Sequence, residues 1–148
     1  MHINLRTIVD NSSHDVVFQH FNRSLFEKLS PPFPPFELQR FDGCLTGDKV
    51  EIELNFFLFK QNWNSDIIDH GSTKQKSWFV DSGFKLPFFL SFWEHQHIIQ
   101  QVGKNVEVID AIEFKGKFPF LSFLVYPILY LTFSQRKPIY KRLLSNLS

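Results

Sequence analysis

The chain has 148 residues, and 16 Lys and Arg against 15 Asp and Glu leave a formal net charge of +1. This length fits one domain, expected over residues 1–148, and the interspersed charges give no basic face for binding nucleic acid. The single cysteine, Cys44, excludes an internal disulfide and favours a reducing, cytoplasmic location. The first ten residues alternate polar and apolar side chains and do not resemble a signal peptide.

The N-terminal third predicts a strand followed by two short helices. Residues 2–9 have strand alternation, and a serine is available to cap a helix over residues 14–21. A second short helix is predicted over residues 22–29. It must end before the proline-rich segment 31–35, because the residue before a proline avoids the helical conformation.

From Phe36 onward the hydrophobic period changes to two, which predicts a run of antiparallel hairpins with glycines at the turns. The clearest alternation places Val50, Ile52, Leu54 and Phe56 on one inward face. The predicted strands are 36–41, 49–57, 62–70, 74–81, 92–101 and 105–114.

Residues 118–133 are almost wholly apolar. As a helix they would extend about 24 Å, short of the roughly 30 Å hydrocarbon core of a membrane, so we predict no transmembrane span. We predict a buried helix packed on the sheet, with a kink or restart at Pro127 and a last helical stretch that begins at Pro138.

Two imidazoles and a carboxylate fall on one face of the last predicted hairpin. His95 and His97 point to the same face as Trp93, because side chains alternate along a strand. Asp110 interrupts an otherwise apolar row on the next strand, and this row is assigned to the interior. Its members are Val106, Val108, Asp110, Ile112 and Phe114.

The turn of this hairpin leaves two registers open. A two-residue type II′ turn at Gly103-Lys104 would set His97 opposite Asp110, whereas a four-residue loop would set Ile99 opposite Asp110. Both registers keep the histidines and the aspartate on the same face.

A carboxylate in an apolar row costs several kcal/mol unless it is paired, and an imidazole is the obvious partner. One interpretation is a structural polar pair that lines a cavity. The other is catalysis, with His97 as general base and Asp110 fixing its tautomer. A metal site is not expected, because zinc needs three or four ligands and Asp110 is the only evident addition to the two histidines.

In the order of its elements, the sequence resembles the START-like (SRPBCC) superfamily, particularly its small single-domain bacterial members, over nearly its whole length. Leu86-Pro87-Phe88 departs from the family's usual Gly-Pro-Phe, and residues 117–121 lack its usual glycines. The resemblance is carried by Leu29-Ser30-Pro31-Pro32, Trp63 with Ile67, Phe79-Val80-Asp81, Trp93-x-His95-x-His97, Asp110 and Ile139-Tyr140-Lys141-Arg142.

The resemblance implies an α+β helix-grip fold, in which a curved seven-stranded antiparallel sheet wraps a long C-terminal helix, with two short helices after the first strand. Members of the superfamily bind lipids, polyketides and other hydrophobic molecules. We therefore expect binding of a hydrophobic small molecule between the sheet and the helix, without a cofactor. The predicted ligand contacts are Leu54, Phe56, Trp78, Trp93, His95, His97, Asp110, Ile112, Phe123, Tyr126 and Tyr130.

Two alternative functions remain. The first is an enzyme of the polyketide cyclase or aromatase type, which the resemblance implies and which would use His97 and Asp110. The second is a membrane-surface or protein-interaction module, because the chain has 19 phenylalanines and many stand in runs. Neighbouring rings on a strand point to both faces, so some are exposed or line a cavity. The candidate surfaces are residues 56–59, 88–92 and 118–133.

Overall fold

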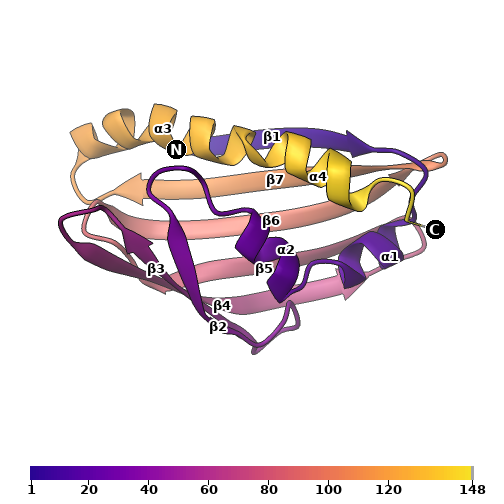
Figure 1. Cartoon of the computed structure of the whole chain (residues 1–148), viewed down its shortest axis with the longest axis horizontal. Helices are drawn as coiled ribbons and strands as arrows, with labels where there is room; N and C mark the ends of the chain where they lie inside the picture. Colours follow the sequence, from indigo (N-terminus) through magenta and orange to yellow (C-terminus); the bar gives the residue numbers. More distant parts are fainter. Residues whose placement is uncertain (148) are drawn as a thin grey trace.

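The computed structural model describes residues 1–147. Its order of one strand, two short helices, six strands and a C-terminal helical segment agrees with the prediction (Figure 1). The elements are β1 (His2–Val9), α1 (His14–Gln19), α2 (Arg23–Lys28), β2 (Phe36–Phe41), β3 (Lys49–Asn55), β4 (Lys60–Ser72), β5 (Lys76–Lys85), β6 (Leu90–Val102), β7 (Asn105–Gly116), α3 (Pro119–Ser134) and α4 (Arg136–Leu144).

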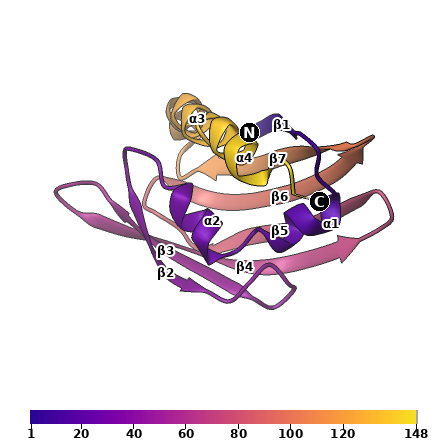
Figure 2. The same cartoon turned by 45° about the vertical axis from the view of Figure 1, so that its right-hand side comes forward.

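The seven strands form one antiparallel sheet in the order β1-β7-β6-β5-β4-β3-β2. Irregularities in the pairings β2–β3, β4–β5 and β6–β7 add local bend and twist. Figure 2 shows the resulting curvature, with all four helices on the inner side of the sheet. This arrangement confirms the predicted curved sheet and its short helices.

The two short helices are held by buried side chains, and only α2 has a side-chain N-cap, because Ser13 at the start of α1 makes no capping hydrogen bond. Asn22 caps α2, and its side chain accepts a hydrogen bond from the Leu25 backbone at 3.0 Å. Val17 of α1 and Leu25 of α2 are buried. Each helix is two residues shorter than predicted. α1 ends before its C-cap His20, and α2 ends before its C-cap Leu29.

The hairpin between β6 and β7 adopts the first of the two predicted registers, with His97 paired to Asp110. Gly103 has a φ of +60°, a conformation that glycine adopts without the penalty of a Cβ atom. The interior row of β7 is confirmed, since Val106, Asp110 and Phe114 are all 2% exposed or less.

The C-terminal helical segment breaks at a different residue from the one predicted. α3 continues through Pro127 as far as Ser134, and the interruption falls at Gln135. Pro138 is the third residue of α4 rather than the first. A proline is tolerated there because the N–H groups of a first helical turn have no partner within the helix. α3 has 16 residues, and no helix within residues 1–147 is long and apolar enough to cross a bilayer.

Candidate functional site

A cavity of about 390 Å³ lies between α3 and the inner face of strands β3 to β6. The alternation of these strands places every second side chain toward it, as in Val50, Ile52 and Leu54 of β3. The other apolar walls come from strands β2 and β4 to β6, from α2 and α3, from the proline-rich segment and from two loops. They include Phe26, Leu29, Pro31, Pro34, Phe36, Phe56, Trp63, Ile67, Phe79, Phe89, Trp93, Leu121, Leu124, Val125, Ile128, Leu129 and Phe133.

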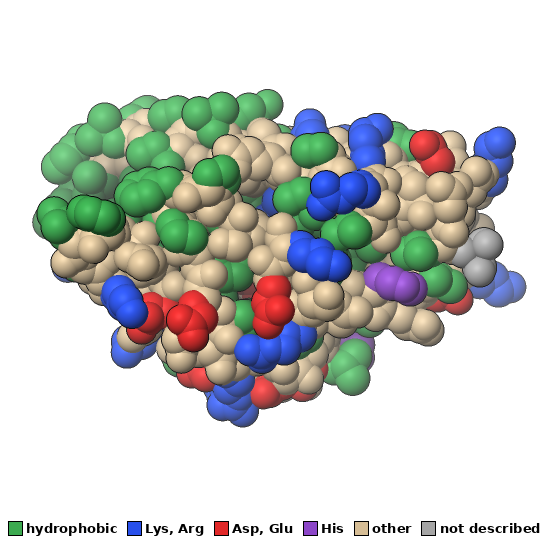
Figure 3. All heavy atoms as spheres, in the orientation of Figure 1, with side chains coloured by type: hydrophobic (Ala, Val, Ile, Leu, Met, Phe, Trp, Pro, Cys, Tyr) green, Lys and Arg blue, Asp and Glu red, His purple; other side chains and the backbone are tan. Residues whose placement is uncertain are grey.

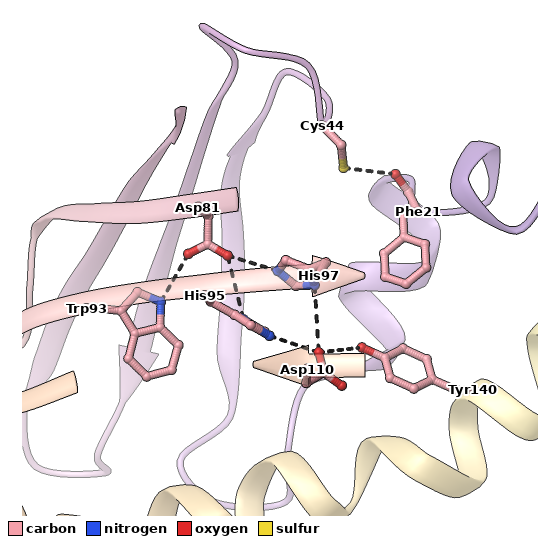
Figure 4. A network of polar contacts seen from close by, with 8 residues as sticks. All are labelled: Phe21, Cys44, Asp81, Trp93, His95, His97, Asp110 and Tyr140. Atoms are coloured by element: carbon pink, nitrogen blue, oxygen red, sulfur yellow. Dashed lines mark hydrogen bonds and ion pairs between the residues drawn. The ribbon is translucent and has the colours of Figure 1, made fainter. Parts of the chain in front are cut away.

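Few ionisable groups interrupt this apolar lining. Asp81 on β5, His95 and His97 on β6, and Arg136 at the start of α4 line the cavity. Figure 4 shows that the carboxylate of Asp81 and both imidazoles point toward one another from neighbouring strands. We call these three residues, together with Asp110 on β7, the polar cluster.

The polar cluster pairs each imidazole closely with one carboxylate. His95 Nε2 lies 2.8 Å from Asp110 Oδ1, and His97 Nε2 lies 2.9 Å from Asp81 Oδ2 (Figure 4). Because an ionised carboxylate only accepts hydrogen bonds, the two ring nitrogens are the donors. The second nitrogen of each ring is farther from the other carboxylate, at 3.6 Å for His95 Nδ1 to Asp81 and 3.7 Å for His97 Nδ1 to Asp110.

Neighbouring side chains fix the orientation of the polar cluster. Trp93 Nε1 donates to Asp81 Oδ1 at 3.0 Å, and Tyr140 reaches Asp110 Oδ1 at 3.5 Å. The His97 ring stacks on Phe79, with 4.0 Å between ring centroids. These contacts leave little rotational freedom to either carboxylate or to His97.

Burial and hydrogen bonding set the protonation states. Burial lowers the pKa of His97 to about 4, and the neighbouring His95 adds to this shift, so His97 is neutral at pH 7. Burial raises the pKa of Asp81, but the hydrogen bonds from His97 and Trp93 and the electrostatic interactions with the two imidazoles outweigh it and leave the pKa below its usual value. Burial also raises the pKa of Asp110, but the hydrogen bond from His95 and the electrostatic interactions with His95, His97 and Arg136 together outweigh it and leave the pKa lowered.

Arg136 is the remaining charged group of the lining. Its guanidinium stacks over the Phe133 ring, 4.2 Å from the centroid, which is a cation–π geometry. Nη1 of Arg136 is buried and has no hydrogen-bond partner among the described residues. An acceptor on a bound molecule would satisfy this donor.

Five of the eleven predicted ligand contacts line the cavity, and they come from the two strands β3 and β6 and from the loop after β3. Their positions follow directly from strand alternation, which puts the two histidines on the same face as Trp93. The five are Leu54, Phe56, Trp93, His95 and His97.

The other six predicted contacts do not line the cavity. Asp110 and Ile112 lie on the inner face of the sheet, but Asp110 stands behind His95 and Ile112 packs in a core cluster below α3. Trp78 points to the outer face and donates to Asp69 at 3.0 Å. The remaining three lie on other sides of α3, where Phe123 is 70% exposed, Tyr130 is 42% exposed, and Tyr126 packs near Phe114.

Asp81 is the functional candidate that sequence reasoning missed. The motif Phe79-Val80-Asp81 contributes to the family resemblance. Strand alternation also indicates its position, because Asp81 lies on the same inner face as the apolar Phe79. The predicted tautomer partner of His97 is also wrong. Asp81 takes the short hydrogen bond from His97, while Asp110 takes the one from His95.

Comparison with known proteins identifies the architecture. No protein-family model matches the sequence, and no curated protein matches it either. Among solved structures, a protein from Chromobacterium violaceum is 13% identical, with 97% of this chain and 96% of that chain covered and a TM-score of 0.67. An aromatase/cyclase from Streptomyces sp. R1128 is 12% identical, with 80% and 69% covered and a TM-score of 0.57.

Norcoclaurine synthase from Thalictrum flavum, solved with dopamine and hydroxybenzaldehyde, is 11% identical, with 91% of this chain and 82% of that chain covered and a TM-score of 0.58. At these identities the similarity concerns the fold. The curved sheet, the short helices after β1 and the C-terminal helix are shared features of this group. The chain therefore has the helix-grip fold.

Proposed function

We propose that the protein binds a hydrophobic small molecule in the cavity between α3 and the sheet. The observation that carries this proposal is the cavity itself, about 390 Å³ of space with apolar walls and few ionisable groups. Ligand sites in proteins usually have this composition and a volume of about 300–1,000 Å³. The cavity volume is near the lower end of this range, which favours a small amphipathic ligand.

The polar cluster and Arg136 orient such a ligand. The side chain of Asp81 is 16% exposed, whereas those of His95 and His97 are 3% exposed or less. Asp81 is therefore the carboxylate most accessible to a hydroxyl or amine of a ligand, and Arg136 Nη1 is a donor without a partner. The apolar body of the ligand then lies along the α3 wall.

A displacement assay tests this proposal. An environment-sensitive apolar dye is bound to the protein and then displaced by panels of fatty acids, phenols and aromatic acids. We expect displacement by at least one amphipathic class, and an at least tenfold weaker dye affinity in Val125→Trp, because Val125 lines the cavity. Val102→Trp is the matched control, since Val102 is 50% exposed at the end of β6. Dye binding that is equal in both variants contradicts the proposal.

A second candidate function is attachment to a membrane surface. Large apolar side chains are exposed beside the cavity, on α3 and on the neighbouring loops, and Figure 3 shows them gathered over the α3 end of the molecule. A patch of this kind marks an interaction site. We call it the mouth surface, and it comprises Phe33, Phe57, Leu58, Phe59, Phe88, Phe118, Phe120, Phe123, Leu124, Ile128 and Leu131.

The charges around the mouth surface favour an anionic bilayer as its partner. Segments 54–60, 84–92 and 114–135 contain four lysines and no acidic residue. Of these lysines, Lys60 forms an ion pair with Glu53 at 3.3 Å. Apolar side chains flanked by lysines suit the boundary between acyl chains and negatively charged headgroups. Leu124 belongs to the mouth surface and also lines the cavity, so a ligand can pass between the bilayer and the cavity.

Vesicle co-sedimentation tests the membrane proposal. We expect binding to vesicles of phosphatidylcholine with phosphatidylglycerol, and a loss of at least tenfold in Leu58→Asp, which puts a carboxylate on a side chain that is 85% exposed. Ile68→Asp is the control, because Ile68 is 49% exposed on β4, away from these segments. Absence of vesicle binding, or dimerisation through the same surface in sedimentation velocity runs, contradicts it.

A further inference from the structure

We propose that the inner end of the cavity holds a divalent transition-metal ion of the zinc type, with Asp81, His95 and His97 as its ligands. This site is independent of the proposed small-molecule function, because it can fill whether or not the cavity contains a ligand. The sequence offered no third ligand besides Asp110, and the fold supplies one by bringing β5 beside β6.

The donor atoms converge on one point. One atom from each of Asp81, His95 and His97 lies within 4.8 Å of the other two. Asp81 Oδ2 is 2.9 Å from His97 Nε2 and 3.6 Å from His95 Nδ1. Two ligands bound tetrahedrally to zinc at 2.0–2.1 Å lie about 3.3 Å apart, so both distances are close to the required separation.

Asp110 and Trp93 provide the surrounding hydrogen bonds that a metal site needs. Histidines that bind a metal through one nitrogen usually donate the other N–H to a carboxylate. His95 does so with Asp110 at 2.8 Å through Nε2, which leaves the lone pair of its Nδ1 beside Asp81. Trp93 Nε1 donates to the second oxygen of Asp81 at 3.0 Å and fixes the direction of the carboxylate.

The site also accounts for an orphaned polar atom. His97 Nδ1 is buried and has no hydrogen-bond partner among the described residues. With a metal on Nε2, the proton of this ring moves to Nδ1, which lies 3.7 Å from Asp110. The orphaned acceptor then becomes a donor that faces a carboxylate.

Charge and access favour a cation at this position. Two carboxylates lie in the polar cluster, and the only Lys or Arg among the residues described as lining the cavity is Arg136. Two nitrogen ligands and one oxygen ligand suit zinc and similar divalent ions rather than calcium or magnesium. Three protein ligands leave a fourth position open, and because all three residues line the cavity, this position faces the bound molecule.

Calorimetric titration of the chelator-treated protein with Zn²⁺ alone tests the site. We expect one ion per chain in the native protein, loss of this binding in Asp81→Asn and His95→Gln, and a 10–100-fold weaker affinity in Asp110→Asn, which alters only the surrounding hydrogen bond. His2→Gln is the matched control, because His2 is exposed on β1 and lies outside the cluster. Unchanged binding in Asp81→Asn overturns the proposal.

A measurement on the unsubstituted protein covers the case in which a variant fails to fold. Crystals soaked in ZnCl₂ are measured on both sides of the zinc absorption edge. We expect anomalous density within about 2.1 Å of His95 Nδ1, His97 Nε2 and Asp81 Oδ2. Density at exposed histidines only, or a titration of the native protein without heat and without bound zinc, overturns the proposal. Either result leaves the displacement assay for a hydrophobic ligand unaffected.

Discussion

The two ends of the cavity differ in which side chains are buried and which are exposed to solvent. At the inner end, charged side chains are buried, and each carboxylate of the polar cluster is held by an imidazole at 2.8 or 2.9 Å. At the mouth surface, apolar side chains are exposed, with Phe57 at 88% and Phe123 at 70%. The carboxylates of the inner end are paired with this chain's own imidazoles, whereas the mouth surface has no covering among the described residues.

This difference leads to different expectations for substitutions at the two ends. The buried hydrogen bonds of the polar cluster contribute to the stability of the fold as well as lining the cavity, so substitutions there are expected to lower the free energy of unfolding. Exposed apolar side chains contribute little to stability, so their substitution is expected to affect binding alone. The predictions below test each half of this comparison.

The largest effect is expected for Asp110→Ala. This change leaves the His95 ring N–H without its 2.8 Å acceptor in the interior and removes a buried side chain, so an unsatisfied donor and a cavity together cost about 3–4 kcal/mol. Urea denaturation measures the free energy of unfolding. Glu37→Ala is the control, because Glu37 is exposed on β2 and should change stability by less than about 0.5 kcal/mol. Equal effects at the two sites contradict the comparison.

The next effect is a dependence of stability on pH. The pKa of His97 is lowered to about 4 from 6.5, so the unfolded chain takes up a proton at a higher pH than the folded one. The free energy of unfolding should therefore fall by about 3 kcal/mol between pH 6.5 and pH 4, at ~1.4 kcal/mol per pH unit. It should fall further below pH 3.8, because the pKa values of Asp81 and Asp110 are lowered in the folded state.

Denaturation series at several pH values check this dependence. His97→Gln keeps a donor for Asp81 but has no proton to gain, so its stability should be nearly flat between pH 6.5 and pH 4. If the free energy of unfolding of this variant falls with pH as steeply as that of the native protein, other groups cause the pH dependence and the prediction is contradicted.

The smallest effect is expected at the mouth surface. Phe57 has a φ of +73° in an exposed turn, a conformation that costs a bulky residue free energy without any burial in return. Phe57→Asn should raise the free energy of unfolding by about 0.5–1 kcal/mol, because asparagine tolerates this region. Thermal denaturation and vesicle binding are measured together. If the residue serves membrane attachment, the more stable variant binds vesicles more weakly.

Strand alternation made most of the sheet predictable from the sequence. Val50, Ile52 and Leu54 line the cavity as expected, and the row that contains Asp110 is interior. The pairing of the charged groups was harder to derive, because it depends on which strand lies on the other side of β6. Asp81 comes from β5, and no spacing within one hairpin reveals that neighbour.

The face of α3 was the least predictable feature. This helix is apolar on all sides, so its periodicity does not distinguish the wall of the cavity from the exposed side. Phe123 and Tyr130 were predicted to contact the ligand and lie on the exposed side, while Leu124 and Val125 line the cavity. Only the docking of α3 on β7 and β1 decides between these faces.

Native mass spectrometry of the protein purified from bacterial extract tests the central claim most directly, when the native chain and Val125→Trp are measured side by side. The account predicts a non-covalently bound small molecule on the native chain and none on the variant, whose indole occupies the cavity. A native chain that carries no such molecule after incubation with a hydrophobic extract, or an equal adduct on both proteins, contradicts it.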